Sequence, residues 1–380
     1  MNFTRRTTLG LLGAVSFNQL TIPVFAQGVK NRKFIFILLR GGMDGLSALT
    51  PDDVGELSYI RPKLSKQMGE RINLNNGFSL HPALAHLKTF YDENDVTFIH
   101  ACSTSYRERS HFEAQDMLEL LAHGNQQEGW LNRTLSVIGG QGLAIARGVP
   151  LAMQGPHSVA NWSPPLFDVA PENLLDRLTD LYSSDPQFSE PLKTARQNKI
   201  SGLPINRRLN RRFTYEPTIT LKALGQRMAM NGGPGIGMVA IDGWDTHANQ
   251  AGTLNRKFKN LNEGLLVLKQ ELAELWNNSC IVIASEFGRT AAMNGTRGTD
   301  HGTGGLMMLL GGAVKGGNVK GDWPGIKKTN LYQGRDLAPA NDVTAVLKGV
   351  LRDHLGIDRT TLDNSIFPNS SRAFDGLIQS

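Results

Sequence analysis

Short apolar runs alternate with longer amphipathic segments along most of the chain. Near-continuous apolar runs, which are typical of strands buried on both faces, occupy residues 33–39, 96–100, 236–241, 280–284 and 306–310, with a shorter candidate at 150–153. Apolar residues recur at helical spacing over 81–94, 110–121, 221–230, 249–276 and 342–355. This alternation predicts an α/β fold, with a doubly wound, mainly parallel sheet flanked by helices.

One segment interrupts the alternation. Residues 155–215 are rich in Pro, Ser, Asn and Arg, with helical pieces near 172–183. We therefore expect a single α/β domain over residues 27–380 that carries an insertion or cap near 155–215.

The N-terminus has the features of an export signal. Thr4-Arg5-Arg6-Thr7-Thr8-Leu9 resembles a twin-arginine motif, a weakly apolar stretch follows, and Val24-Phe25-Ala26 offers a cleavage site. The alternative is an ordinary amphipathic N-terminus. The signal interpretation assigns residues 1–26 to a signal peptide, makes the twin-arginine export machinery a partner, and predicts a periplasmic or secreted protein.

Composition and charge narrow the class of protein. With 40% apolar and 19% charged residues, the 380-residue chain can bury a sizeable core, and it has no apolar run of 18 residues that would span a bilayer. We therefore expect no stable membrane insertion. The formal charge of +6 falls to +4 if Arg5 and Arg6 leave with the signal, which is too small to indicate nucleic-acid binding. Cys102 and Cys280 fall at opposite ends of predicted parallel strands, so no disulfide is expected between them.

Polar residues follow the predicted strands, where ligands collect in sheets of this kind. Asp44 lies in the glycine-rich segment 41–45 after the first strand, either as an ion ligand or as part of a turn. Asp245 and His247 follow the strand at 236–241, and residues two apart in an extended segment share a face. A carboxylate beside an imidazole suits Zn²⁺, Mn²⁺ or Fe²⁺, whereas the alternative is a surface turn.

Two further clusters flank the last two strands. Glu286 and Arg289 follow the strand at 280–284, either as a metal ligand and an anion-binding group or as a pair with each other. Asp300 and His301 lie in the glycine-rich segment 298–305, directly before the strand at 306. A histidine there either binds metal or hydrogen-bonds a neighbouring loop.

Ser110 opens a predicted helix, and Glu113 completes a Ser-x-x-Glu capping box. A hydroxyl at a helix N-terminus is also well placed to act on an anionic group, because the helix dipole favours negative charge there. The capping and chemical interpretations are compatible.

Taken together, these motifs resemble an exported, uncharacterised bacterial family described as sulfatase-like. The motifs are Gly41-Gly42-Met43-Asp44-Gly45, Ser110-His111-Phe112, Gly243-Trp244-Asp245-Thr246-His247, Ser285-Glu286-Phe287-Gly288-Arg289-Thr290 and Asp300-His301-Gly302. The resemblance covers essentially the whole mature chain. It extends to the alkaline phosphatase and sulfatase superfamily, and so implies an alkaline-phosphatase-like fold.

That wider resemblance implies a role for each candidate residue. Asp44, Asp245, His247, Glu286, Asp300 and His301 would hold a divalent metal such as Zn, Mn, Mg or Ca, with Asp300 either as a ligand or as a partner of one. Ser110 is the preferred nucleophile, His111 is counted with the catalytic residues, and Arg289 would steady the anionic group.

Two departures from the superfamily pattern limit this inference. Residues 102–107 lack the Pro of the sulfatase pattern Cys-x-Pro-x-Arg and shift its Arg by one, which argues against formylglycine chemistry. Phe287 replaces a ligating His, which weakens one of two metal sites. The leading hypothesis is a metal-dependent hydrolase of phosphate or sulfate esters that acts in the periplasm on an anionic small-molecule or polymer substrate. The alternative is a non-catalytic metal- or ligand-binding or assembly protein on the same scaffold.

Overall fold

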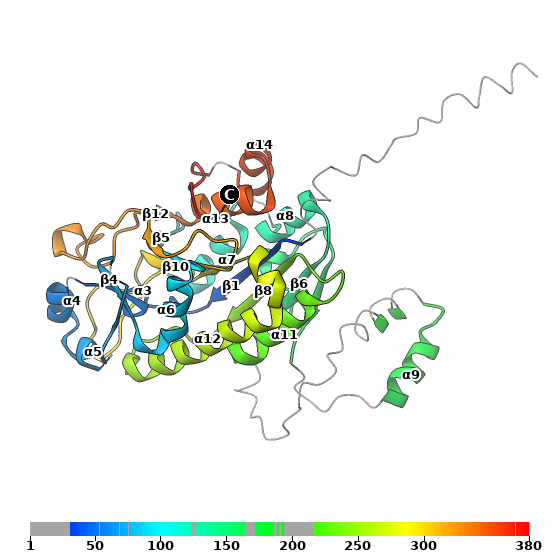
Figure 1. The fold of residues 1–380 in the computed structure, drawn as a ribbon, viewed down its shortest axis with the longest axis horizontal. Coiled ribbons are helices and arrows are strands. Elements are labelled where there is room, and N and C mark those ends of the chain that lie inside the picture. Colours follow the sequence, from blue (N-terminus) through cyan, green and yellow to red (C-terminus); the bar gives the residue numbers. More distant parts are fainter. Residues whose placement is uncertain are drawn as a thin grey trace, which may run out of the picture.

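The structure is a computed structural model that describes residues 31–52, 54–67, 69–74, 76–122, 127–164, 172–185, 188–189, 192–193, 216–368 and 370–379 (Figure 1). The expected signal peptide at 1–26 lies outside the described residues, and so does much of the expected insertion. Within that insertion the helix predicted near 172–183 is present as α9 (Glu172–Leu181).

The centre of the fold is one mixed sheet. Nine of the described strands belong to it, in the spatial order β11-β5-β10-β9-β1-β8-β6-β7, with β12 paired to β5. Their bounds are β1 Lys33–Leu39, β5 Val96–Ser103, β6 Gly142–Ile145, β7 Val159–Trp162, β8 Ile236–Ile241, β9 Ser279–Ala284, β10 Gly305–Leu310, β11 Asn318–Lys320 and β12 Asn341–Asp342. A separate small sheet has the order β2-β4-β3, with bounds β2 Leu49–Pro51, β4 Phe78–Leu80 and β3 Ile72–Asn73.

Among the described strands of the main sheet, β10 has the opposite direction to its neighbours. It pairs antiparallel with β5 and with β9, whereas every other pairing is parallel. The N-terminal end of β10 therefore lies at the edge where β1, β5, β8 and β9 end. For this reason the segment that precedes β10, with Asp300 and His301, joins the loops that follow the other strands.

Successive side chains of β1 enter two different cores, as the alternation of a strand requires. Ile35, Ile37 and Leu39 pack in one apolar cluster, whereas Phe34, Phe36 and Leu38 pack in the other. Helices α6 (Ala85–Asp92), α11 (Pro217–Ala229) and α12 (Gln250–Leu272) cover the first face. Helices α7 (His111–Leu120), α8 (Trp130–Ile138) and α13 (Val343–Leu355) cover the second, as Figure 1 shows. The predicted doubly wound, mainly parallel α/β architecture is thus confirmed.

The remaining elements are short. The helices are α3 Gly45–Ala48, α4 Val54–Ile60, α5 Pro62–Gln67 and α14 Arg359–Thr361. The tighter or wider helical turns are η1 Pro82–Leu84, η2 Leu151–Met153, η3 Ala273–Asn278, η4 Lys328–Asn330 and η5 Leu362–Ile366.

One element prediction was wrong. The strand candidate at 150–153 is the 3₁₀ turn η2, and the strands of this region are β6 and β7 on either side of it. Pro150 fixes the entry to the turn and cannot donate to a ladder, while the residues of β7 are only partly buried and so lack a strong apolar signal.

The cysteine expectation agrees with the structure. Cys102 and Cys280 are both free and buried. Within the described part of the chain, no helix combines the length and the apolar character needed to cross a bilayer.

Candidate metal centre

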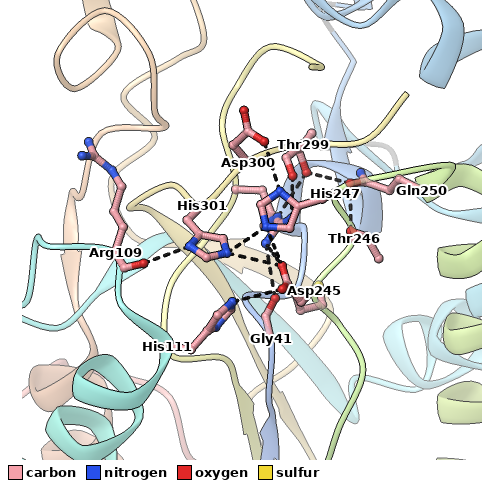
Figure 2. A network of polar contacts seen from close by, with 12 residues as sticks. Gly41, Arg109, His111, Asp245, Thr246, His247, Gln250, Thr299, Asp300 and His301 are labelled. Atoms are coloured by element: carbon pink, nitrogen blue, oxygen red, sulfur yellow. Dashed lines mark hydrogen bonds and ion pairs between the residues drawn. The ribbon is translucent and has the colours of Figure 1, made fainter. Parts of the chain in front are cut away.

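Five chain segments meet at the edge of the sheet where the parallel strands end. The loop after β8, the segment before β10 and the first turn of α7 contribute side chains, and the loop after β1 approaches them with Gly41 (Figure 2). The loop after β9 contributes Glu286 and Arg289, which contact His111 and Asp245. The cluster at their meeting point is formed by His111, Asp245, His247 and His301.

The Asp245 carboxylate lies at the centre of this cluster. Its Oδ1 is 3.0 Å from His247 Nε2 and 3.4 Å from His301 Nε2, and its Oδ2 is 3.5 Å from His111 Nε2. His247 Nε2 and His301 Nε2 are 2.9 Å apart. His111, Asp245 and His301 offer ligand atoms that all lie within 4.8 Å of one another.

Each histidine ring is held from behind through Nδ1. His111 Nδ1 is 2.7 Å from Glu286 Oε1, and His247 Nδ1 is 3.1 Å from Asp300 Oδ1. His301 Nδ1 is 2.9 Å from the Arg109 carbonyl oxygen. In the tautomer in which each Nδ1 donates to its acceptor, each Nε2 presents a lone pair to the cluster and to the Asp245 carboxylate.

These lone pairs have no donor to satisfy them. His247 Nε2 and His301 Nε2 cannot hydrogen-bond each other without an added proton, and His111 Nε2 is buried with no hydrogen-bond partner. Ligands of one ion at about 2.0–2.1 Å would stand roughly 2.9–3.4 Å apart, close to the separations between neighbouring atoms here. Histidines whose Nδ1 is fixed by an oxygen acceptor are the usual arrangement around a metal. The donor set therefore fits a divalent cation.

The charge balance points the same way. Arg289 donates to Asp245 and outweighs the effect of burial, so the pKa of Asp245 is lowered. Burial alone would raise the pKa of Glu286, but hydrogen bonds from His111, Gln115 and the Gly41 backbone lower it. The pKa of Asp300 is lowered by its hydrogen bond from Asn294. Asp245, Glu286 and Asp300 are thus held as carboxylates around the histidines, and negative charge at this position favours a cation.

The pKa shifts of two histidines of the cluster differ in sign. The hydrogen bond to Glu286 raises the pKa of His111, whereas burial lowers the pKa of His301.

The site is open to solvent. The side chains of Asp245 and His247 are 42% and 44% exposed, and those of His301 and His111 are 25% and 21% exposed. A half-open set of ligands is typical of metal sites that admit a substrate.

Asp44 does not lie with the other predicted ligands. Its carboxylate is buried in an ion pair with Arg61, whose Nη1 and Nη2 are 2.7 Å and 3.2 Å from Oδ2 and Oδ1. The Ser47 hydroxyl and the Gln250 side-chain amide also donate to Oδ2. Although burial alone would raise it, the pKa of Asp44 is lowered by Arg61. With its oxygens occupied by protein donors, Asp44 supports the loop rather than facing the histidines.

Arg289 contacts Asp245 and the segment before β10. Its side chain is fully buried, with Nη1 2.8 Å from Asp245 Oδ1 and Nε 3.2 Å from Thr299 Oγ1. Nη2 donates to the Thr299 carbonyl oxygen. The guanidinium thus fixes Asp245 instead of facing open solvent where an anionic substrate would arrive.

Glu286 lies behind a histidine instead of at the cluster centre. Its Oε1 accepts from Gly41 N, His111 Nδ1 and Gln115 Nε2, at 2.8 Å, 2.7 Å and 2.9 Å. Since this side chain is fully buried, the structure gives it the part of a carboxylate that orients a histidine, whereas the sequence indicated a ligand.

Ser110 is the N-cap residue of α7, as predicted, but Ser110 and Glu113 do not form the reciprocal hydrogen bonds of a capping box. The Ser110 side chain makes no capping hydrogen bond to the helix. Instead the Tyr106 hydroxyl donates to Glu113 and accepts from Ser110 N at 3.2 Å. Ser110 adjoins both His111, which belongs to the cluster, and Arg109, which holds His301.

Close backbone approaches explain part of the glycine content. A Cβ on Gly41, whose φ is +120°, would stand 2.4 Å from Asp245 N, and one on Gly298 would stand 2.3 Å from His247 C. Only glycine lets these loops approach so closely.

Phe287 forms a wall of the site. Its ring centroid is 4.8 Å from that of His111 and 5.2 Å from that of His301. The residue that departs from the superfamily pattern therefore packs directly against two of the candidate ligands.

The sequence did not single out several residues that support the cluster. Arg61 neutralises Asp44, Arg109 presents its carbonyl to His301, and Asp336 binds the Arg109 guanidinium. Arg61 and Asp336 are buried charged residues, 17 and 227 positions from Asp44 and Arg109, and no local pattern marks such pairs.

Comparisons with known proteins give one family and several structures. A protein family described as "Protein of unknown function (DUF1501)" matches residues 203–365. The expected resemblance to an uncharacterised family is thus supported over those residues. No curated protein matches the chain.

Three solved structures illustrate the structural likeness. They are the lipoteichoic acid synthase LtaP from Listeria monocytogenes (9% identity, covering 89% of this chain and 75% of that one, TM-score 0.38), the C-terminal periplasmic domain of EcEptC from Escherichia coli in complex with Zn (7%, 74% and 72%, 0.36) and the alkaline phosphatase of the Antarctic bacterium TAB5 (10%, 73% and 91%, 0.36). At 7–10% identity and TM-scores below 0.4, these likenesses do not extend to a substrate or a reaction.

Proposed function

We propose that the protein is a metal-dependent hydrolase of phosphate or sulfate esters that uses one divalent cation. The observation that carries the proposal is the convergence of imidazole Nε2 lone pairs on Asp245, with each Nδ1 proton already donated to an oxygen. His111, Asp245 and His301 would hold the ion, with His247 as the fourth ligand. Asp44 is left out of this set because Arg61 occupies its carboxylate.

A divalent cation at this position would act as a Lewis acid toward the ester and its attacking group. The side chains behind the ligands have complementary tasks. Glu286 and Asp300 keep the protons of His111 and His247 on Nδ1, and Arg289 keeps Asp245 ionised and in place. Ser110 is the proposed nucleophile, since it is the N-cap of α7, whose dipole favours an anionic group, and its neighbour His111 is a ligand.

A single ion is proposed because of Phe287. An aromatic ring that packs on His111 and His301 occupies the place where the resemblance predicts another ligand, and a phenyl ring offers no lone pair. The same residue favours the second candidate function, a protein that binds metal on this scaffold without turnover.

The first test is the metal content of the purified mature chain, measured by elemental analysis after reconstitution with Zn²⁺ or Mn²⁺. We expect close to one ion per chain, and loss of that ion in His301→Ala and Asp245→Asn. His86→Ala is the matched control, because His86 lies on α6 and pairs with Glu263. Absence of stoichiometric metal in the wild-type protein would refute the proposal.

The second test separates the two candidate functions. Ser110→Ala should abolish cleavage of aryl phosphate or aryl sulfate esters while the metal content stays unchanged. Ser105→Ala, a change of an exposed serine in the same loop, should retain turnover. If the wild-type protein holds its ion but cleaves neither ester class, the non-catalytic binding function is the better description.

The location is part of the proposal. Arg5 and Arg6, the weakly apolar stretch that follows them and the site at Ala26 support twin-arginine export to the periplasm or beyond. Replacing both arginines by lysine should leave the protein in the cytoplasmic fraction. Export of that double variant at the wild-type level would contradict this assignment.

A further inference from the structure

A fully buried carboxylate links two segments that fix one candidate ligand. Asp336, which is 0% exposed, accepts on Oδ2 from Arg109 Nε and Nη2 at 3.0 Å and 2.8 Å. The same oxygen accepts from Thr303 Oγ1 at 2.8 Å, and Oδ1 accepts from Arg335 Nη1 at 2.9 Å. Asp336 therefore draws its donors from the loop before α7, from the segment before β10 and from its own neighbour.

The first of these segments presents the acceptor for His301. His301 Nδ1 donates to Arg109 O at 2.9 Å, a contact drawn in Figure 2, and with Nδ1 as the donor the Nε2 lone pair faces Asp245. Arg109 has a φ of +62°, in the left-handed region that is unfavourable for a residue with a Cβ. The Arg109 side chain at this position is bound to Asp336 through Nε and Nη2.

The second segment carries His301 itself. Thr303 follows His301 by two residues, and its hydroxyl is bound to the same Asp336 oxygen as the Arg109 guanidinium. In addition, Thr290 forms a backbone bridge with Asp336, while the preceding Arg289 forms one with His301. Asp336 thus lies at the point where the acceptor of His301 and the backbone around His301 are tied together.

We propose that Asp336 is a positioning residue of the metal centre: through Arg109 it holds the carbonyl that fixes the tautomer and orientation of His301. This inference rests on the proposed function, since it takes His301 as a metal ligand. Asp336 touches neither the cluster nor a substrate, so its effect is indirect. The chain of contacts is Asp336 to the Arg109 guanidinium, then the Arg109 carbonyl to His301 Nδ1.

The test uses Asp336→Asn, which preserves shape and removes the charge. Two properties are measured: the Co²⁺ dissociation constant with the visible spectrum of bound Co²⁺, and the ring tautomer of His301 by ¹⁵N NMR of the metal-free protein. The NMR signal is assigned with His301→Ala. We expect a dissociation constant 10- to 100-fold higher, an altered Co²⁺ spectrum and a loss of the Nδ1–H tautomer.

Asp363→Asn is the matched control for a merely structural effect. Asp363 pairs with the buried Lys348 on α13, away from the cluster, so its loss should lower stability without moving either property. A second comparison tests the backbone step. Arg109→Gly keeps the carbonyl and tolerates a positive φ, so His301 should stay closer to wild type in it than in Arg109→Ala.

The outcomes separate this inference from the proposed function. If wild-type protein binds Co²⁺ and Asp336→Asn binds it equally well with the same spectrum and tautomer, the positioning role is refuted and the proposed function stands. If wild-type protein binds no Co²⁺, the proposed function fails, and the NMR comparison still decides whether Asp336 positions His301. Equal effects of Asp363→Asn would also overturn the positioning role.

Discussion

Replacing Asp44 with Asn removes the negative charge that balances Arg61 in the interior. Both side chains are buried, at 1% and 0% exposure, and three donors converge on Asp44 Oδ2. If the amide oxygen of Asn takes that position, its NH₂ group faces Arg61 Nη2, which now donates across 3.2 Å to Oδ1. One charged hydrogen bond becomes a contact between two donors, and the buried guanidinium loses its counter-ion.

The expected cost is about 3–5 kcal/mol of unfolding free energy, the range for breaking a buried ion pair by removing one partner. Denaturant unfolding followed by circular dichroism should show a lower midpoint with an unchanged slope. The folded variant should keep the metal content of the wild-type protein, since Asp44 contacts none of the histidines. Asp52→Asn is the control: Asp52 is exposed and lies eight positions after Asp44, so this change should lower the free energy of unfolding by less than about 1 kcal/mol.

Two results would refute this reasoning. A variant as stable as the wild-type protein would show that the Asp44–Arg61 pair does not contribute as the geometry implies. Loss of metal with unchanged stability would show that Asp44 is a ligand after all, as the resemblance suggested from the sequence.

Three further predictions concern the supports of the site and the buried histidines. Glu286→Gln should raise the metal dissociation constant about 10- to 100-fold, because His111 keeps an acceptor but loses a charged one; unchanged affinity in a metal titration would contradict this. Gly41→Ala should lower both stability and metal affinity, since its Cβ would stand 2.4 Å from Asp245 N, whereas Gly148→Ala, with open space around it, should change neither in the same assays. Burial lowers the pKa of His81, His100 and His354 to about 4, below the value of about 6.5 in the unfolded chain. Between these two pH values the unfolded chain binds more protons than the folded one, so the free energy of unfolding should fall as the pH drops from 6.5 toward 4. At pH 5 the free energy of unfolding should be about 2 kcal/mol lower per histidine than at neutral pH. Equal denaturation midpoints at pH 7.5 and pH 5 would contradict this prediction.

Much of the fold could be predicted from local patterns. Strands buried on both faces leave continuous apolar runs, so β1 and β8 were predicted with the bounds that the structure has. The spacing of Asp245 and His247 likewise indicated a shared face, and their side chains do meet. A strand that is only partly buried, such as β7, carries no such signal and was missed.

The sequence by itself predicted where the candidate site residues lie, at one edge of the sheet. Only the tertiary structure decided what each charged side chain does there. Asp44 and Glu286 both follow buried strands, yet one is neutralised by Arg61 and the other orients His111. The physical reason is that a buried carboxylate takes its role from the donors packed around it, and several of those donors, such as Gln250 for Asp44 and Gln115 for Glu286, are brought there only by the fold. The reversed direction of β10, which brings His301 to the same edge, is likewise visible only in its antiparallel pairing with β5 and β9.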